Sequence, residues 1–204
     1  MKGMRPLSRE EILRVMAVFS GTYAVRDHAL FLLGISVGGR VSELLSLEVH
    51  HVWEQNQPVS HLHFDKSIVK GGEVSRTVPV NADGQKAIRM LIGWHREMFG
   101  NLNYGYPLFI SRNSKGTTKP IGRRMADVVF KRAFVLANLT GNLSTHTLRK
   151  TFAQRLYDAT GDIYIVQEML GHKSVATTQK YLGVNYADVQ MGCLLYTSPS
   201  PRDS

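Results

Sequence analysis

The sequence predicts a mainly α-helical fold with a small antiparallel β-sheet, that is, an α+β domain. Apolar residues recur at helical spacing along most of the 204 residues. Only the stretch from about 52 to 80 contains strand-like segments, and these flank a glycine turn. Helices are expected at about 8–19, 24–37 and 41–47, from about 83 onward, and at about 122–138, 145–159, 162–170 and 174–182.

The first helices are marked by their end signals. Ser8 and Glu11 have the spacing of a capping box, which favours a helix that begins at Ser8. Gly38 and Gly39 interrupt the strongly apolar second helix, and a short third helix follows them. Arg40 therefore lies at a helix junction, where a side chain can be held in a fixed direction.

Strand character marks residues 61–65 and 76–80, and an earlier strand is expected to begin at 52–53. Residues 69–73 contain two glycines and have the composition of a hairpin turn, which places Lys70 at that turn. Pro79 indicates an edge strand or a strand end, because proline cannot donate a hydrogen bond to a neighbouring strand. The simplest prediction is one small antiparallel sheet with a lysine at its turn.

The composition favours a polyanionic partner. The chain has 25 Lys and Arg against 16 Asp and Glu, a net charge of +9, which suits nucleic acid first and an anionic membrane second. The single cysteine, Cys193, excludes an internal disulfide and a cysteine-based zinc site, and it fits a reducing, intracellular setting. No apolar run approaches the roughly 20 residues of a membrane span, and no secretory leader is expected.

Six polar side chains form the candidate catalytic set: Arg40, Lys70, His146, Arg149, His172 and Tyr181. Together they suit a phosphodiester. A tyrosine hydroxyl is a nucleophile with a pKa near 10, so it needs help in losing its proton or a well-stabilised transition state. Two guanidiniums can bind the non-bridging oxygens, a lysine can protonate the leaving 5′ oxygen, and histidines can exchange protons near neutral pH. The set holds no carboxylate or thiolate cluster that would bind a metal, so no metal is expected, and no cofactor is assigned.

The spacing of these residues is consistent with one site. His146 and Arg149 are three residues apart and share a helix face near the helix N-terminus, which itself favours a phosphate. His172 follows Gly171 at a turn between two helices, and Tyr181 comes nine residues later on the next helix.

Five segments, in order, resemble the motifs of the tyrosine recombinase or phage-type integrase family. They are GRVSEL at 39–44, KGGEVSRTVPV at 70–80, HTLRKTFA at 146–153, LGHKS at 170–174 and TTQKY at 177–181, and the resemblance covers about residues 6–186. Each motif is weak by itself, but five motifs in the family's order and spacing are a specific signal.

The resemblance implies the fold of the DNA breaking-rejoining enzymes and site-specific recombination, which can be integration, excision or inversion, in a phage or mobile element. It implies that Tyr181 attacks double-stranded DNA to form a 3′-phosphotyrosyl bond and a free 5′-hydroxyl, and that a partner strand's 5′-hydroxyl reverses the reaction. It also implies a homotetramer on two duplexes, accessory DNA-bending proteins as further partners, and a location in the bacterial cytoplasm at the nucleoid, with no membrane partner.

The expected organisation is one catalytic domain over residues 1–191. It begins almost at Met1, so the helical domain that clamps the other face of the DNA in this family is expected to be absent. Residues 192–204 differ in composition from the rest of the chain, with two prolines and three serines at 198–204. This tail resembles translated sequencing adapter and is predicted to be non-native or disordered.

Ordinary structural roles are open for several residues. Arg40 can form a surface ion pair with Glu43, Lys66 is a neighbouring alternative to Lys70, and Tyr164 and Tyr186 are alternatives to Tyr181. His61 and His63 alternate on a strand, which would fit a metal site only with a third ligand. A solvated helix face or a phosphate-binding face are both open for the basic set Arg123, Arg124, Lys131 and Arg132. Two functional alternatives remain: a truncated integrase that binds DNA without recombining it, and a type IB topoisomerase-like activity.

Overall fold

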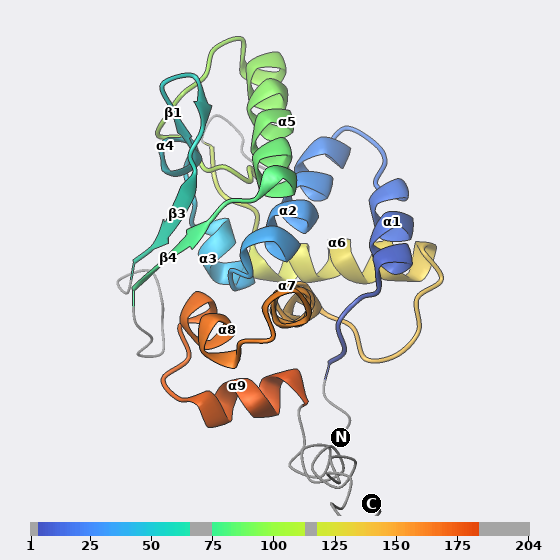
Figure 1. The fold of residues 1–204 in the computed structure, drawn as a ribbon. Helices are drawn as coiled ribbons and strands as arrows, with labels where there is room; N and C mark the ends of the chain where they lie inside the picture. The colour runs from blue at the N-terminus through green and yellow to red at the C-terminus, as the bar shows by residue number, and fades with distance from the viewer. Residues whose placement is uncertain (1–3, 66–74, 113–117, 184–204) are drawn as a thin grey trace, which may run out of the picture.

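The computed structural model describes residues 4–65, 75–112 and 118–183. The described chain is mainly helical, with short strands on one side of the molecule (Figure 1). The helices are α1 (Arg9–Ala17), α2 (Ala24–Val37), α3 (Val41–Leu45), α4 (Val49–Val52), α5 (Ala82–Phe99), α6 (Arg123–Leu136), α7 (Thr145–Thr160), α8 (Ile163–Leu170) and α9 (Val175–Leu182). The strands are β1 (Trp53–Glu54), β2 (Gln57–Pro58), β3 (His61–Phe64) and β4 (Arg76–Pro79). The predicted fold class is confirmed.

The strands differ in detail from the single sheet predicted. In the described residues β1 pairs with β2 and β3 pairs with β4, which gives two separate antiparallel ribbons. Gln55 and Asn56 join β1 to β2 with positive φ angles of 48° and 61°, as tight hairpin turns require. Strands of two residues are too short to show an alternating pattern, so periodicity could not predict this ribbon. Pro79 is the last residue of β4, as predicted.

Helix ends follow the predicted signals. Ser8 caps α1 and forms the capping box with Glu11, although α1 ends at Ala17 rather than at 19. Gly38 ends α2 in the left-handed conformation, with φ 62°. Ser144 caps α7, so the first turn of that helix begins at Thr145 and directly precedes the predicted site residue His146.

Helix α2 lies at the centre of the hydrophobic core. Its residues 29–37 are all buried, and α5 and α7 pack against it (Figure 1). Gly34 lets α7 approach closely, because a Cβ at this position would lie 2.6 Å from Cδ2 of Leu148. The C-terminal end of α2 and the first half of α7 are thereby held together. Among residues 4–65, 75–112 and 118–183, no helix is long and apolar enough to cross a membrane.

A second, smaller core joins the C-terminal helices to α7. Ala153 of α7, Val166 and Leu170 of α8, and Leu182 of α9 are its buried members. Phe152 packs against both cores and links them. The helices that carry the last predicted site residues are therefore attached to the molecule mainly through α7, and α8 also contacts β4.

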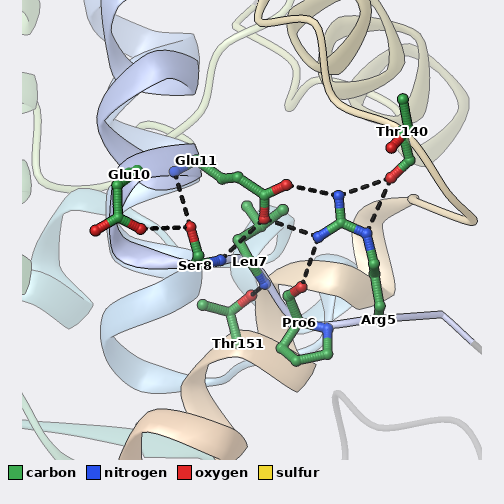
Figure 2. Close-up of polar contacts among 8 residues, drawn as sticks. All are labelled: Arg5, Pro6, Leu7, Ser8, Glu10, Glu11, Thr140 and Thr151. Carbon is green, nitrogen blue, oxygen red and sulfur yellow. Dashed lines mark hydrogen bonds and ion pairs between the residues drawn. The ribbon is translucent and has the colours of Figure 1, made fainter.

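The segment before α1 is also tied to α7 (Figure 2). Arg5 forms a two-pronged ion pair with Glu11, with both nitrogen–oxygen distances 2.7 Å, and donates to the carbonyl oxygen of Thr140. The main-chain nitrogen of Leu7 donates to Oγ1 of Thr151 on α7 over 2.9 Å. These contacts fasten the N-terminal segment across the loop that leads into α7.

Replacing Gly38 with alanine should destabilise the protein more than the same replacement at Gly161. Both glycines end helices with left-handed φ angles, 62° and 66°, so each alanine costs about 1 kcal/mol in backbone conformation. At Gly38 the added Cβ also meets the ring of Phe152, whereas at Gly161 it meets nothing within 4 Å. Overpacking adds about 1–3 kcal/mol. Urea unfolding of both variants should show this difference in the free energy of unfolding. Equal losses would contradict the tight contact between the end of α2 and α7.

Candidate active site

Arg40 lies at the junction of α2 and α3, as the sequence predicts. It is the residue that precedes α3, with extended backbone angles, and its side chain is 27% exposed. Its main-chain nitrogen donates to Oε2 of Glu43 over 2.7 Å, and its Nη1 donates to Oε1 of Glu43 over 3.3 Å. The ion pair with Glu43 that was one reading of Arg40 is therefore present, and it leaves the guanidinium partly open to solvent.

Glu43 is the centre of a buried charge cluster that the sequence did not assign to the site. It is 1% exposed, and Arg76 of β4 donates to both of its oxygens, over 3.0 Å and 2.6 Å. Burial is the largest single influence and raises the pKa of Glu43. The hydrogen bonds and charge of Arg76, the main-chain hydrogen bond from Arg40 and the charge of Arg149 together outweigh it, so the pKa lies below its ordinary value. The only signal for Arg76 was a charged residue at an inward-facing position of a strand.

Arg149 is the most enclosed cation of the site. It lies on α7, is 3% exposed, and donates to the carbonyl oxygen of Gly38 over 2.8 Å and to that of Leu170 over 2.5 Å. Burial, and then the positive charges of Arg40 and Arg76, lower the pKa of Arg149 to about 10. The guanidinium is still charged at neutral pH, although the positively charged Arg40 and Arg76 lie near it.

His146 lies on the first turn of α7 with an exposed side chain. Partial desolvation lowers its pKa, and the charges of Arg123, Arg40 and Arg149 lower it further. The ring is therefore mostly neutral at pH 7. Arg123 begins α6, so the start of the basic α6 face reaches the site, while Lys131 farther along it pairs with Asp127 over 2.9 Å.

His172 and Tyr181 lie together at the turn between α8 and α9. Gly171 ends α8 with a left-handed φ of 67°, and His172 follows it. Nδ1 of His172 shares a hydrogen bond of 3.0 Å with Oγ1 of Thr178. Its ring meets the ring of Tyr181 edge-on, with 5.4 Å between centroids. Thr178 on α9 thus sets the orientation of the imidazole next to the tyrosine.

The Tyr181 hydroxyl is buried and has no hydrogen-bond partner among the residues that the structure describes. Burial raises its pKa, while the charges of Arg149 and Arg40 act in the opposite direction. Nζ of Lys150 lies 5.8 Å from the centre of the phenol ring. A cleft of about 430 Å³ opens beside the ring, and its lining is Met4, His146, Lys150, Thr177, Lys180 and Tyr181.

Five of the six predicted residues therefore come together from four separate segments: Arg40, His146, Arg149, His172 and Tyr181. The sixth, Lys70, lies outside the described residues, as does its alternative Lys66. The arrangement presents a tyrosine hydroxyl beside two guanidiniums and two imidazoles. It can bind an anion of phosphate geometry and place a nucleophile against it.

The structure does not place the described alternative residues, Tyr164, His61 and His63, in this site. Tyr164 of α8 is 68% exposed, and Tyr186 lies outside the described residues. His61 contacts Ser60, and His63 contacts Thr77. Within the described part of the chain, no three His, Cys, Asp or Glu side chains gather as a metal site would need.

Known proteins with similar sequences indicate the family to which this chain belongs. The model of the phage integrase family matches residues 5–188. The chain is 30% identical over 210 residues to the tyrosine recombinase XerC of Ralstonia pickettii, covering 97% of this chain and 61% of that protein. It is 34% identical over 157 residues to XerD of Corynebacterium glutamicum, covering 77% and 48%. The chain thus spans about half to three fifths of the length of these relatives.

Solved structures share the fold. The XerA recombinase superposes with a TM-score of 0.70 at 21% identity, over 98% of this chain and 68% of that one. The Tn1549 transposon integrase with transposon right end DNA gives a TM-score of 0.72 at 15% identity, over 97% and 68%. XerH bound to its difH substrate gives 0.68 at 21%, over 98% and 56%. By its matching family model and its fold, this chain belongs to the phage integrase family and has the tyrosine recombinase catalytic fold.

Proposed function

We propose that this chain carries the DNA-cleaving and DNA-rejoining activity of a site-specific recombinase. The observation that supports this most is the Tyr181 hydroxyl, which is buried, has no partner among the described residues, and lies in the field of Arg149 and Arg40. A buried polar atom without a partner is uncommon in folded proteins, and a catalytic role is one explanation for it. In this proposal the hydroxyl is the nucleophile that attacks a DNA phosphate.

The proposed reaction is an exchange of one phosphodiester for another. The Tyr181 oxygen attacks the phosphorus and loses its proton, a 3′-phosphotyrosyl bond forms, and the 5′ oxygen leaves as a hydroxyl. Arg40 and Arg149 bind the non-bridging oxygens, where negative charge grows in the transition state. His172, held beside the phenol by Thr178, donates to the phosphate. The reverse attack by a 5′-hydroxyl of a partner strand completes the exchange, and no metal or nucleotide enters either step.

The remaining roles follow from position and charge. His146 is mostly neutral at pH 7 because its pKa is lowered, so it can accept the proton of the phenol. Lys70 would protonate the leaving 5′ oxygen, a role that rests on the family resemblance. Residues 1–191 are taken as the catalytic domain, and residues 192–204 as a tail outside it.

The substrate in this proposal is double-stranded DNA. The net charge of +9 suits it, and the XerH and Tn1549 structures were obtained with DNA. A homotetramer on two duplexes, helped by DNA-bending proteins and acting at the nucleoid in the cytoplasm, is the assembly we propose. A second candidate is a protein that binds DNA without cleaving it, since the net charge of +9 favours binding and does not require cleavage.

A covalent DNA adduct separates these two candidates. The wild type, incubated with a nicked suicide duplex selected for binding from a random pool, should form a protein–DNA adduct that survives denaturing electrophoresis. Tyr181→Phe should remove the adduct and keep the binding, because only the nucleophilic oxygen is lost. Tyr164→Phe, which changes a solvent-exposed phenol, is the control and should leave the adduct. Binding by the wild type without any adduct would favour the second candidate.

The pKa of His146 should respond to Arg123 and not to its neighbour Arg124. Protonation of the imidazole adds a positive charge next to Arg123, so Arg123→Gln makes protonation easier and raises the pKa. Because the folded pKa lies below the ordinary value, stability from neutral His146 is present above about pH 6.5 and declines as the pH falls.

NMR titration of the histidine ring protons measures this, with His146→Gln to assign the signal. Arg124→Gln is the matched control, since it removes another exposed charge from the same turn of α6. A pKa at or above 6.5 in the wild type, or an equal response to both variants, would contradict the electrostatic account of the site.

A further inference from the structure

Arg76 is a buried cation that the proposed reaction does not use. It lies at the start of β4, and its side chain is 4% exposed. Nη1 and Nη2 donate to Oε1 and Oε2 of Glu43 over 3.0 Å and 2.6 Å, a parallel two-pronged contact. The guanidinium lies over the ring of Phe64, 4.6 Å from its centre. Ring and carboxylate together fix the plane of the guanidinium.

Glu43 is at the same time the partner of Arg40. Oε2, which accepts from Nη2 of Arg76, also accepts from the main-chain nitrogen of Arg40 over 2.7 Å. Oε1, which accepts from Nη1 of Arg76, also accepts from Nη1 of Arg40 over 3.3 Å. Each carboxylate oxygen therefore links the two arginines, and the plane that Arg76 imposes on the carboxylate determines where Arg40 is held.

Arg76 also keeps Glu43 charged. A carboxylate that is 1% exposed would gain a proton if it had no cation at both oxygens. Arg40 is a weaker partner for Glu43 than Arg76, since its side chain is 27% exposed and the contact of its Nη1 with Oε1 of Glu43 measures 3.3 Å. A protonated Glu43 would lose one acceptor and with it part of the attachment of Arg40.

A direct contact between Arg76 and DNA is disfavoured by the same geometry. Arg76 does line a cleft of about 630 Å³ that His172 also borders. Two of its nitrogens, however, are bound to Glu43, and the third, Nε, is sealed from solvent. Each terminal nitrogen keeps a second hydrogen, but the side chain is only 4% exposed, which leaves little of it accessible to a phosphate.

We infer that Arg76 is a positioning residue for DNA cleavage: its two-pronged contact with Glu43 holds Arg40 where it can bind the scissile phosphate, an inference that rests on the proposed function. Arg76 belongs to the β3–β4 ribbon and Arg40 to the α2–α3 junction. The position of the ribbon is therefore coupled to the position of a phosphate-binding arginine 36 residues earlier in the chain.

The test is Arg76→Lys, made in the wild type and in Arg40→Ala. Lysine keeps a positive charge beside Glu43 but is a point charge without the planar fork. The Tm should fall by less than in Arg76→Met, because the positive charge is kept, and the DNA Kd should stay close to that of the parent protein. The single-turnover cleavage rate on a nicked suicide duplex at saturating protein should fall at least about tenfold, since small displacements of a catalytic group cost up to about 10²-fold. In Arg40→Ala the same change should have no further effect, because the residue to be positioned is gone.

Two outcomes would overturn the inference. A full cleavage rate in Arg76→Lys would show that the fork is not needed. Equal rate losses in both backgrounds would show that Arg76 acts independently of Arg40, as a general structural residue or a DNA contact would. Arg89→Lys, an exposed arginine of α5, is the control and should change nothing. Arg76→Met should lower the Tm, and adding Glu43→Gln should restore the Tm but not the rate.

The pKa of His146 can be measured without DNA cleavage, so it tests this inference separately from the proposed function. If the wild type forms no adduct, the proposed function fails. The pKa of His146, which the charge of Arg40 helps to lower, still reports the position of that arginine. Arg76→Lys should then change this pKa in the wild type and leave it unchanged in Arg40→Ala. An unchanged pKa in both proteins would overturn the positioning role.

Discussion

The hydrogen bonds of Arg149 to two main-chain carbonyl oxygens are the interaction on which the site depends. One carbonyl belongs to Gly38, directly after α2, and the other to Leu170, the last residue of α8. A cation is favourable at both helix C-termini. Gly38 and Gly171 both turn the chain away in the left-handed conformation. Arg40 and His172, each two residues beyond its carbonyl, are thereby brought to the same guanidinium.

The site contains more positive charge than its carboxylate can balance. Arg40, Arg76 and Arg149 surround Glu43, and their mutual repulsion adds to burial in lowering the pKa of Arg149 to about 10. Burial and the charges of Arg123, Arg40 and Arg149 lower the pKa of His146, and the charges of Arg149 and Arg40 oppose the rise in pKa that burial causes at Tyr181. A phosphate would relieve this repulsion. In the proposed function, the cations are held in place before DNA binds, which is how preorganised sites stabilise a charged transition state.

Most of the helices and five of the six candidate site residues could be predicted from the sequence, because local sequence signals mark them. The capping box at Ser8, the glycine break at Gly38 and the long apolar runs predicted the main helices. The motif spacing predicted five residues that the structure brings together. The ion pair of Arg40 with Glu43 was treated as an alternative to a catalytic role, whereas in the structure Glu43 holds the arginine in the site.

The parts that could not be predicted depend on long-range contacts. Arg76 meets Glu43 across 33 residues, and no periodic pattern connects a strand residue with a helix residue at that distance. The bonds of Arg149 go to main-chain oxygens, which every residue has and which no side-chain pattern marks. The β1–β2 ribbon is too short to leave a signal in the sequence.

The most direct test of the account is a crystal structure of the wild type with a nicked duplex and vanadate, a mimic of the pentavalent transition state. Vanadium should bond to the Tyr181 oxygen, and guanidinium nitrogens of Arg40 and Arg149 should lie within hydrogen-bond distance of the non-bridging oxygens, with the Arg149 carbonyl contacts retained. A vanadate bound away from Tyr181, or bound without either arginine, would contradict the central claim that these residues form one phosphate site.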